Sequence, residues 1–183
     1  GQMTQLAMDG LTPDKVRGLG LGSVLSGGGA APTNNTPEGW CAMVDSFQNA
    51  ALSSRLQIPI IYGIDSVHGN NTLKDSTVFP HNIGLGATGD ADLVERIGRA
   101  VAIETAAAGI PWTFAPCVAV ARDPRWGRTY ESYGQDTALV TKLGASFIRG
   151  FQGADVGSAA KPVATAKHFL GDGGTVWGTS TTN

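Results

Sequence analysis

Apolar residues along this chain fall into two alternating patterns. Four short apolar runs, bounded by glycine, proline or charged residues, are typical of buried strands in a parallel sheet. They cover residues 21–26, 58–64, 113–118 and 163–166. Longer segments between the runs carry apolar residues at helical spacing. The pattern therefore predicts about four βα units in succession.

The starts and ends of three helices can be predicted from single residues. Thr36, which a proline follows, and the two aspartates Asp90 and Asp136 are expected to cap helices. Side-chain oxygens at this position accept the free N–H groups of the first helical turn. Gly109 and Gly153 are expected to end the last two of these helices, because glycine readily adopts the left-handed conformation.

Alternating strands and helices imply a parallel sheet covered by helices. Such a sheet is either open and doubly wound or closed into a barrel, and periodicity does not choose between them. A TIM barrel needs eight βα units and about 250 residues. On the barrel interpretation, the 183 residues would form about half of the fold. We would then expect the natural protein to be longer.

Composition and charge limit the partners of the chain. With 42% hydrophobic and 15% charged residues, the chain can bury a substantial core. A net charge of −2 and a pI near 5.9 leave no basic face for nucleic acid or an anionic membrane surface. Apolar stretches fall far short of the roughly 20 residues that span a bilayer, so no membrane insertion is expected. The chain also starts without a signal peptide pattern.

Several motifs that would indicate other chemistry are absent or lie in the wrong context. Residues 84–89 match G-x-G-x-x-G, but Pro80 precedes them where a dinucleotide fingerprint requires a strand. The hypothesis of a nucleotide-dependent enzyme on an open α/β sheet therefore depends on that string alone. His68, His81 and His168 lack zinc-binding spacing, so no metal and no cofactor are expected.

The two cysteines, Cys41 and Cys117, show no CxxC spacing. They could form at most one disulfide, which is too few for a disulfide scaffold. We interpret them as buried free thiols.

Charged side chains follow three of the four predicted strands. Asp65 follows the second run, Arg128 lies in the charged segment after the third, and Lys167 and His168 follow the fourth. Barrel active sites are built at this end of the strands. These four groups can pair with sugar hydroxyls, which both donate and accept hydrogen bonds. Asp65 could instead cap the next helix.

Ordinary structural roles exist for the other charged residues too. Arg128 could pair with Asp123 or Glu131, and Lys167 could balance Asp172. No two acids can be placed opposite each other from sequence, so spacing does not give the reaction class. Two tryptophans, Trp126 and Trp177, could provide an aromatic platform for a sugar or simply cover a core.

Four separated motifs occur in order over nearly the whole chain. They are residues 62–69, 79–86, 122–128 with Glu131 and Ser132, and 167–174. Together these motifs resemble glycoside hydrolase family 3. Residues 171–174, Gly-Asp-Gly-Gly, look like the β-glucosidase and exo-β-glucanase branch rather than the N-acetylhexosaminidase branch.

The resemblance implies an α/β fold, namely a partial (β/α)8 TIM barrel of about the first four βα units of a longer enzyme. Residues 1–183 would be one partial domain, without the α/β sandwich domain that follows in the family. Residues matching Asp65, Arg128, Lys167 and His168 would hold a terminal, non-reducing glucose. The aspartate nucleophile and the glutamate acid/base would lie after Asn183, so this part alone would be inactive.

The activity implied by the resemblance is hydrolysis of terminal β-D-glucosyl residues by retaining double displacement, without a metal or cofactor. Substrates would be β-glucosides or oligosaccharides such as cellobiose. Kinship also implies a periplasmic or secreted parent protein. The alternatives are a non-catalytic sugar-binding barrel and an N-acetylhexosaminidase of the same family.

Overall fold

The computed structural model describes residues 1–154, 161–177 and 179, which contain a five-stranded parallel sheet. Strand order follows the chain, and each strand pairs in parallel with the next. The strands are β1 (Gln5–Ala7), β2 (Ser23–Ser26), β3 (Ile61–Ile64), β4 (Trp112–Thr113) and β5 (Val163–Ala164). The predicted four strands are thus present, and a fifth precedes them.

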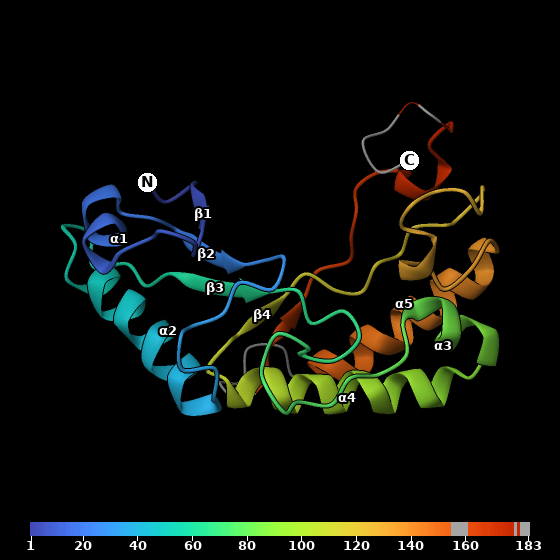
Figure 1. Ribbon diagram of the computed structural model, residues 1–183, viewed down its shortest axis with the longest axis horizontal. Coiled ribbons are helices and arrows are strands. Elements are labelled where there is room, and N and C mark those ends of the chain that lie inside the picture. Colours follow the sequence, from blue (N-terminus) through green and yellow to red (C-terminus); the bar gives the residue numbers. More distant parts are fainter. Residues whose placement is uncertain (155–160, 178, 180–183) are drawn as a thin grey trace.

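The helices that connect the strands lie along one side of the sheet. Figure 1 shows the three long helices, α2 (Pro37–Leu52), α4 (Ala91–Ala107) and α5 (Thr137–Gln152), below the strands. Sequential strand order with right-handed crossovers places helices on one face, whereas a doubly wound sheet has helices on both. The fold is therefore that of part of a (β/α)8 barrel. The helices are α1 (Pro13–Leu19), α2 (Pro37–Leu52), α3 (Asn82–Thr88), α4 (Ala91–Ala107) and α5 (Thr137–Gln152), with short 3-10 helices η1 (Thr129–Glu131) and η2 (Asp172–Gly174).

The structure confirms the predicted helix boundaries. The side chains of Thr36, Asp90 and Asp136 each accept the backbone N–H three residues on, at 3.2, 3.0 and 2.7 Å. Gly109 follows α4 with a φ of 74°, and Gly153 ends α5 with a φ of 66°. Both are positive-φ conformations, which cost glycine little because it lacks a Cβ atom.

Three elements are not predicted by the sequence analysis. Strand β1 has only three residues and lies at an edge of the sheet, so it lacks a long apolar run. Helix α1 begins with Thr12 as its cap and Pro13 at its first position, the same signal that predicts α2. Helix α3 includes residues 84–88 of the glycine-rich string, for which the sequence analysis predicts no element. There Gly86 packs directly on the backbone carbonyl of Tyr133, where a side chain would not fit.

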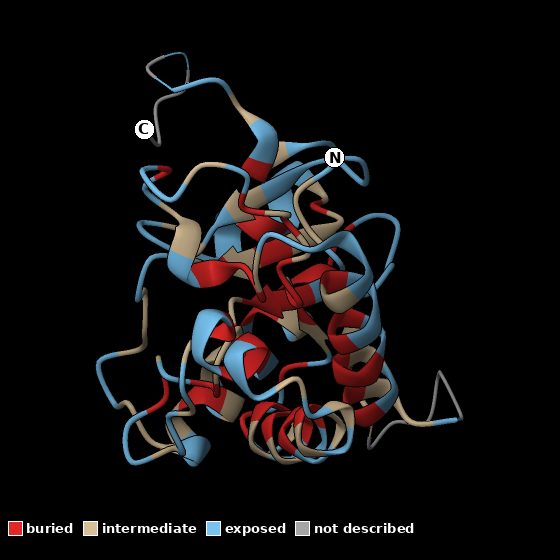
Figure 2. Ribbon diagram, turned by 90° about the vertical axis from the view of Figure 1, so that its right-hand side faces the viewer, coloured by how far each residue is buried: buried red, intermediate tan, exposed pale blue. Residues whose placement is uncertain are grey.

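Two apolar clusters hold the helices against the sheet, and Figure 2 shows their buried residues in red. One cluster joins α1 and α2 to β2 and β3, and the other joins α3, α4 and α5. The largest fully buried side chains include Trp40, Tyr62, Tyr133, Phe147 and Phe151. Among the described residues, no helix is both long and apolar enough to cross a bilayer.

Both cysteines are free thiols, as predicted, but only one is buried. Cys117 is fully buried, whereas Cys41 lies partly exposed on α2. Burial is the main cause that raises the pKa of each thiol, Cys117 and Cys41 alike. Neither thiol is therefore activated as a nucleophile.

Candidate functional site

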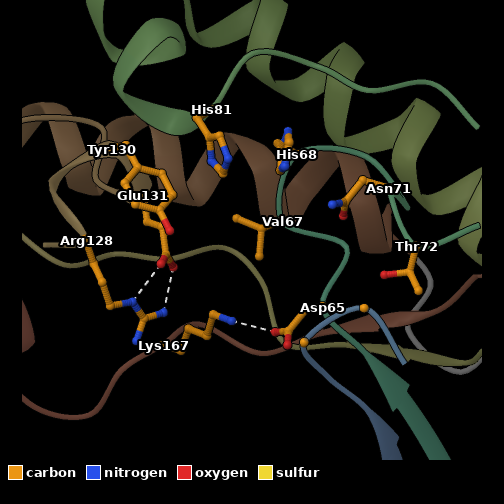
Figure 3. A pocket seen from close by; sticks show the side chains of 12 residues that line it. Asp65, Val67, His68, Asn71, Thr72, His81, Arg128, Tyr130, Glu131 and Lys167 are labelled. Carbon is orange, nitrogen blue, oxygen red and sulfur yellow. Dashed lines mark hydrogen bonds and ion pairs between the residues drawn. The ribbon is translucent and has the colours of Figure 1, made fainter. Parts of the chain in front are cut away.

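A pocket of about 490 Å³ opens at the carboxyl ends of the strands (Figure 3). The segments that follow β2, β3, β4 and β5 all contribute to it, which is how barrel sites are assembled. Its lining residues are Gly28, Gly29, Asp65, Val67, His68, Asn71, Thr72, His81, Arg128, Tyr130, Glu131 and Lys167.

Asp65 and Lys167 form an ion pair in this pocket. Asp65 follows β3, Lys167 follows β5, and Lys167 Nζ donates to Asp65 Oδ1 at 2.6 Å. The Lys167 side chain is 15% exposed and that of Asp65 is 38% exposed. Each group retains hydrogen-bonding capacity, because a carboxylate has two oxygens and an ammonium has three hydrogens.

Arg128 and Glu131 form a second, bidentate pair. Arg128 Nε and Nη2 donate to the two carboxylate oxygens of Glu131, each at 2.6 Å. Burial alone would raise the pKa of Glu131, but the hydrogen bonds and charge of Arg128 outweigh it and lower that pKa. The hydrogen bond to Glu131 is also the main cause that raises the pKa of Arg128. Both side chains are therefore ionised at neutral pH.

His168 lies beside the pocket rather than on its lining. Arg128 Nη2 lies 3.2 Å from His168 Nε2, and Nδ1 lies 3.0 Å from Asp172 Oδ2, although that contact lacks hydrogen-bond geometry. Burial, followed by the charges of Arg128 and Lys167, lowers the pKa of His168. Because Arg128 can only donate, Nε2 accepts, and the neutral ring carries its proton on Nδ1.

Three rings form another wall of the pocket. His68 and His81 stack with centroids 3.8 Å apart, and Tyr130 meets His81 edge-on at 4.7 Å. Figure 3 shows these rings on the side of the pocket away from Asp65 and Lys167. Burial and the neighbouring His68 lower the pKa of His81, so its ring is neutral at neutral pH.

The structure thus gathers the four residues that the sequence analysis singles out. Asp65, Arg128 and Lys167 line one pocket, and His168 contacts Arg128. Of the alternative roles, the pairing of Arg128 with Glu131 is correct. The suggested pairing of Lys167 with Asp172 is replaced by its pair with Asp65.

Two other suggestions need correction. Asp123 pairs with Arg125 at 2.6 Å and not with Arg128. Of the two roles suggested for Trp126, the sugar platform is wrong and the core role is correct, because Trp126 is only 3% exposed and packs in a small core cluster. Trp177 is 45% exposed, but it lies under the Arg125 guanidinium and outside the pocket lining.

The glycine-rich string has no geometry for phosphate binding. Residues 84–88 lie within α3, and Gly89 ends that helix with a φ of 62°. The segment before α3 is a loop and not a strand, so the context that a dinucleotide fingerprint requires is missing. Within the described part of the chain, no group of three or more His, Cys, Asp or Glu side chains could hold a metal ion.

Sequence reasoning did not single out several lining residues. Gly28 and Gly29 follow β2 with φ values of 60° and 87°, so the chain turns there in a conformation that favours glycine. The run of three glycines at residues 27–29, directly after a predicted strand, was the available signal. The stacking of His68 on His81 had no sequence signal, because it depends on how a long loop folds back.

Comparison with known proteins places the chain in a family. The profile described as "Glycosyl hydrolase family 3 N terminal domain" matches residues 1–182. The lysosomal beta glucosidase of Dictyostelium discoideum is 36% identical across 93% of this chain. The periplasmic beta-glucosidase of Salmonella typhimurium is 39% identical across 66% of it.

A solved structure shows the same fold over nearly the whole chain. The exo-1,3/1,4-beta-glucanase of a Pseudoalteromonas species superposes with a TM-score of 0.88 and 48% identity, covering 96% of this chain. The chain spans only part of each of these proteins: 24% of the Dictyostelium enzyme, 15% of the Salmonella enzyme and 23% of the Pseudoalteromonas chain.

Proposed function

This chain belongs to glycosyl hydrolase family 3, and from that premise we propose that its parent protein hydrolyses terminal, non-reducing β-D-glucosyl residues. In this proposal, residues 1–183 form part of the barrel of a longer enzyme. The small share of each relative that the chain spans supports the greater length. The names of the relatives support the β-glucosidase activity, and that of the Salmonella enzyme supports a periplasmic or secreted location.

The pairing of Asp65 with Lys167 in the same pocket as Arg128 is the observation that carries the proposal. A hydroxyl group both donates and accepts hydrogen bonds, so adjacent sugar hydroxyls suit a carboxylate beside an ammonium. Asp65 would accept from two hydroxyls, while Lys167 and Arg128 would donate to their oxygens. We propose that Asp65, Arg128, Lys167 and His168 hold the terminal glucose.

The charge balance of the pocket supports a neutral substrate. Each lining cation, Lys167 and Arg128, has a carboxylate oxygen at 2.6 Å. A phosphate or uronate would have to compete with Asp65 and Glu131 for these cations, and the nearby negative charge would repel it. A neutral glucoside adds no charge. Together with the names of the relatives, this supports β-glucosides as the proposed substrates, and the resemblance adds oligosaccharides such as cellobiose.

We propose that the chemistry is retaining double displacement with the reacting acids elsewhere in the protein. Among the described residues, the two carboxylates that line the pocket are Asp65 and Glu131, and a cation holds each of them. A general acid needs a raised pKa, whereas that of Glu131 is lowered. As the resemblance to the family implies, an aspartate nucleophile and a glutamate acid/base would lie after Asn183.

The test is to assay the full-length parent protein with aryl β-D-glucoside, β-D-glucuronide and N-acetyl-β-D-glucosaminide. We expect hydrolysis of the glucoside, with the β-anomer of glucose appearing first in NMR spectra. Rapid cleavage of the N-acetylglucosaminide alone would favour the N-acetylhexosaminidase alternative. Glucose binding without any hydrolysis would favour a non-catalytic sugar-binding barrel. Either of these results would overturn the proposal.

A further inference from the structure

We propose that Glu131 is a positioning residue, which fixes the Arg128 guanidinium so that its free edge meets the sugar and its other edge holds His168. The inference rests on the proposed function and adds a residue to it. Glu131 would act through Arg128 and would not touch the reacting atoms. The way in which each nitrogen of Arg128 is used supports this role.

The bidentate pair leaves one defined edge of Arg128 for a ligand. Nε and one hydrogen of Nη2 are directed at Glu131, and Nη2 also lies 3.2 Å from His168 Nε2. No hydrogen bond from Nη1 reaches another described residue, and its nearest acid, Asp172, is 4.0 Å away. The two Nη1 hydrogens are therefore the donors that Arg128 can offer in the pocket.

The side chain of Glu131 is nearly buried, and hydrogen bonds hold the backbone that carries it. Its side chain is only 10% exposed, compared with 27% for Arg128. The backbone N–H of Glu131 donates to the Arg128 carbonyl at 2.9 Å, and its own carbonyl accepts from Asn82 Nδ2 at 2.9 Å. Asn82 is buried at the start of α3. Helix α3 thus anchors the group that orients Arg128.

Without this carboxylate, Arg128 would have other partners within reach. Asp172 lies near both Arg128 and His168, and it is the remaining acid of the cluster. A guanidinium that paired with Asp172, which lies 4.0 Å from Nη1, would use the Nη1 hydrogens that it otherwise offers to the sugar. Displacement of a positioning group by about 1 Å can cost about 100-fold in rate. The expected effect is therefore on transition-state binding and not on folding alone.

The experiment is a double-mutant cycle in the full-length protein with Glu131→Gln, Arg128→Met and both together. We expect Glu131→Gln to lower kcat/KM for the glucoside by up to about 100-fold. The double variant should be no worse than Arg128→Met alone, because both changes disable the same contact. If the fold-loss in kcat/KM of the double variant equals the product of the two single losses, so that the cycle is additive in free energy, the inference would be overturned.

Monodeoxy glucosides provide a readout that a purely structural role would not move. One analogue should lack the hydroxyl that Arg128 contacts, and on it Arg128→Met should no longer lower kcat/KM. On the same analogue, Glu131→Gln should no longer lower kcat/KM either. An equal loss on every analogue would overturn the inference. Glu131→Asp keeps the charge but retracts the carboxylate, so we expect it to lower kcat/KM as well. Wild-type activity in Glu131→Asp would show that charge alone matters and would also overturn it.

A matched control is available on the outer helices. Glu95 pairs with Arg149 at 3.1 Å between α4 and α5, with both side chains about half exposed, and Glu95→Gln should leave kcat/KM unchanged. If the wild-type protein hydrolyses no glycoside, the proposed function fails. If it hydrolyses glucosides but the cycle is additive, only the role of Glu131 fails.

Discussion

Lys167 and Asp65 lie 102 residues apart in the sequence, yet the lysine Nζ is 2.6 Å from the aspartate Oδ1. Their strands, β5 and β3, are not neighbours, because β4 lies between them. The two side chains meet across the carboxyl end of the sheet, where Figure 3 shows the pair beside Arg128. This relationship turns separate strand ends into one binding site.

Replacing Asp65 should reduce activity far more than stability. In the full-length protein, Asp65→Asn is expected to lower kcat/KM for a β-glucoside by about 100-fold or more. It loses charged hydrogen bonds worth roughly 1.5 to 3 kcal/mol each and leaves Lys167 without its partner. Steady-state kinetics would measure the effect. Asp14→Asn is the control, because the Asp14 side chain is 82% exposed on α1. Equal losses in the two variants would contradict a binding role for Asp65.

The stability contributed by Glu131 should disappear in acid. Its folded-state pKa is lowered below the ordinary value of 4.5, so the folded protein binds the proton less readily than the unfolded chain. The contribution is thus complete above about pH 4.5 and is lost as pH falls through the folded pKa. Thermal midpoints of the full-length protein and its Glu131→Gln variant should therefore converge as the pH is lowered from neutral to below 4.5. A constant difference across this range would argue against the prediction.

His168 should titrate below the ordinary histidine value and be protonated on Nδ1 at neutral pH. Burial is the main cause of the lowered pKa, and the charges of Arg128 and Lys167 add to it. NMR of isotopically labelled histidine would report both the pKa and the tautomer. In Arg128→Met the pKa should rise, because the lowering charge of Arg128 is removed while the raising charges of Asp172 and Glu131 remain. Protonation on Nε2 in the wild type would be inconsistent with the Arg128 contact.

Close packing of α4 on α5 should make Gly150 intolerant of a side chain. A Cβ atom there would overlap the Glu95 carbonyl oxygen, so Gly150→Ala should destabilise the pair by roughly 1 to 3 kcal/mol. Gly18, inside α1, has open space within 4 Å of the position that a Cβ atom would take, so Gly18→Ala should stabilise slightly. Hydrogen exchange in the full-length protein would measure both effects, in α5 for the Gly150 variant and in α1 for the Gly18 variant. Reduced protection in the Gly18 variant alone would reverse the expectation.

Local sequence signals predicted the long helices well. Thr36, Asp90 and Asp136 cap the helices that they were expected to cap, because capping needs only a side-chain oxygen and a backbone N–H three residues away. The same signal at Thr12 marks α1, which was overlooked. Strand β1 and helix α3 carried weaker signals, since one is very short and the other is rich in glycine.

Local sequence is enough to predict the alternation of strands and helices and the charged residues that follow three of the strands. Those features depend on periodicity and capping, which act over a few residues. The packing of the folded chain is needed to see that Lys167 pairs with Asp65, that Arg128 pairs with Glu131 rather than Asp123, and that Trp126 is buried. Such choices depend on strand order and on how loops pack. A side chain selects its partner by distance in space, and distance along the chain does not fix it.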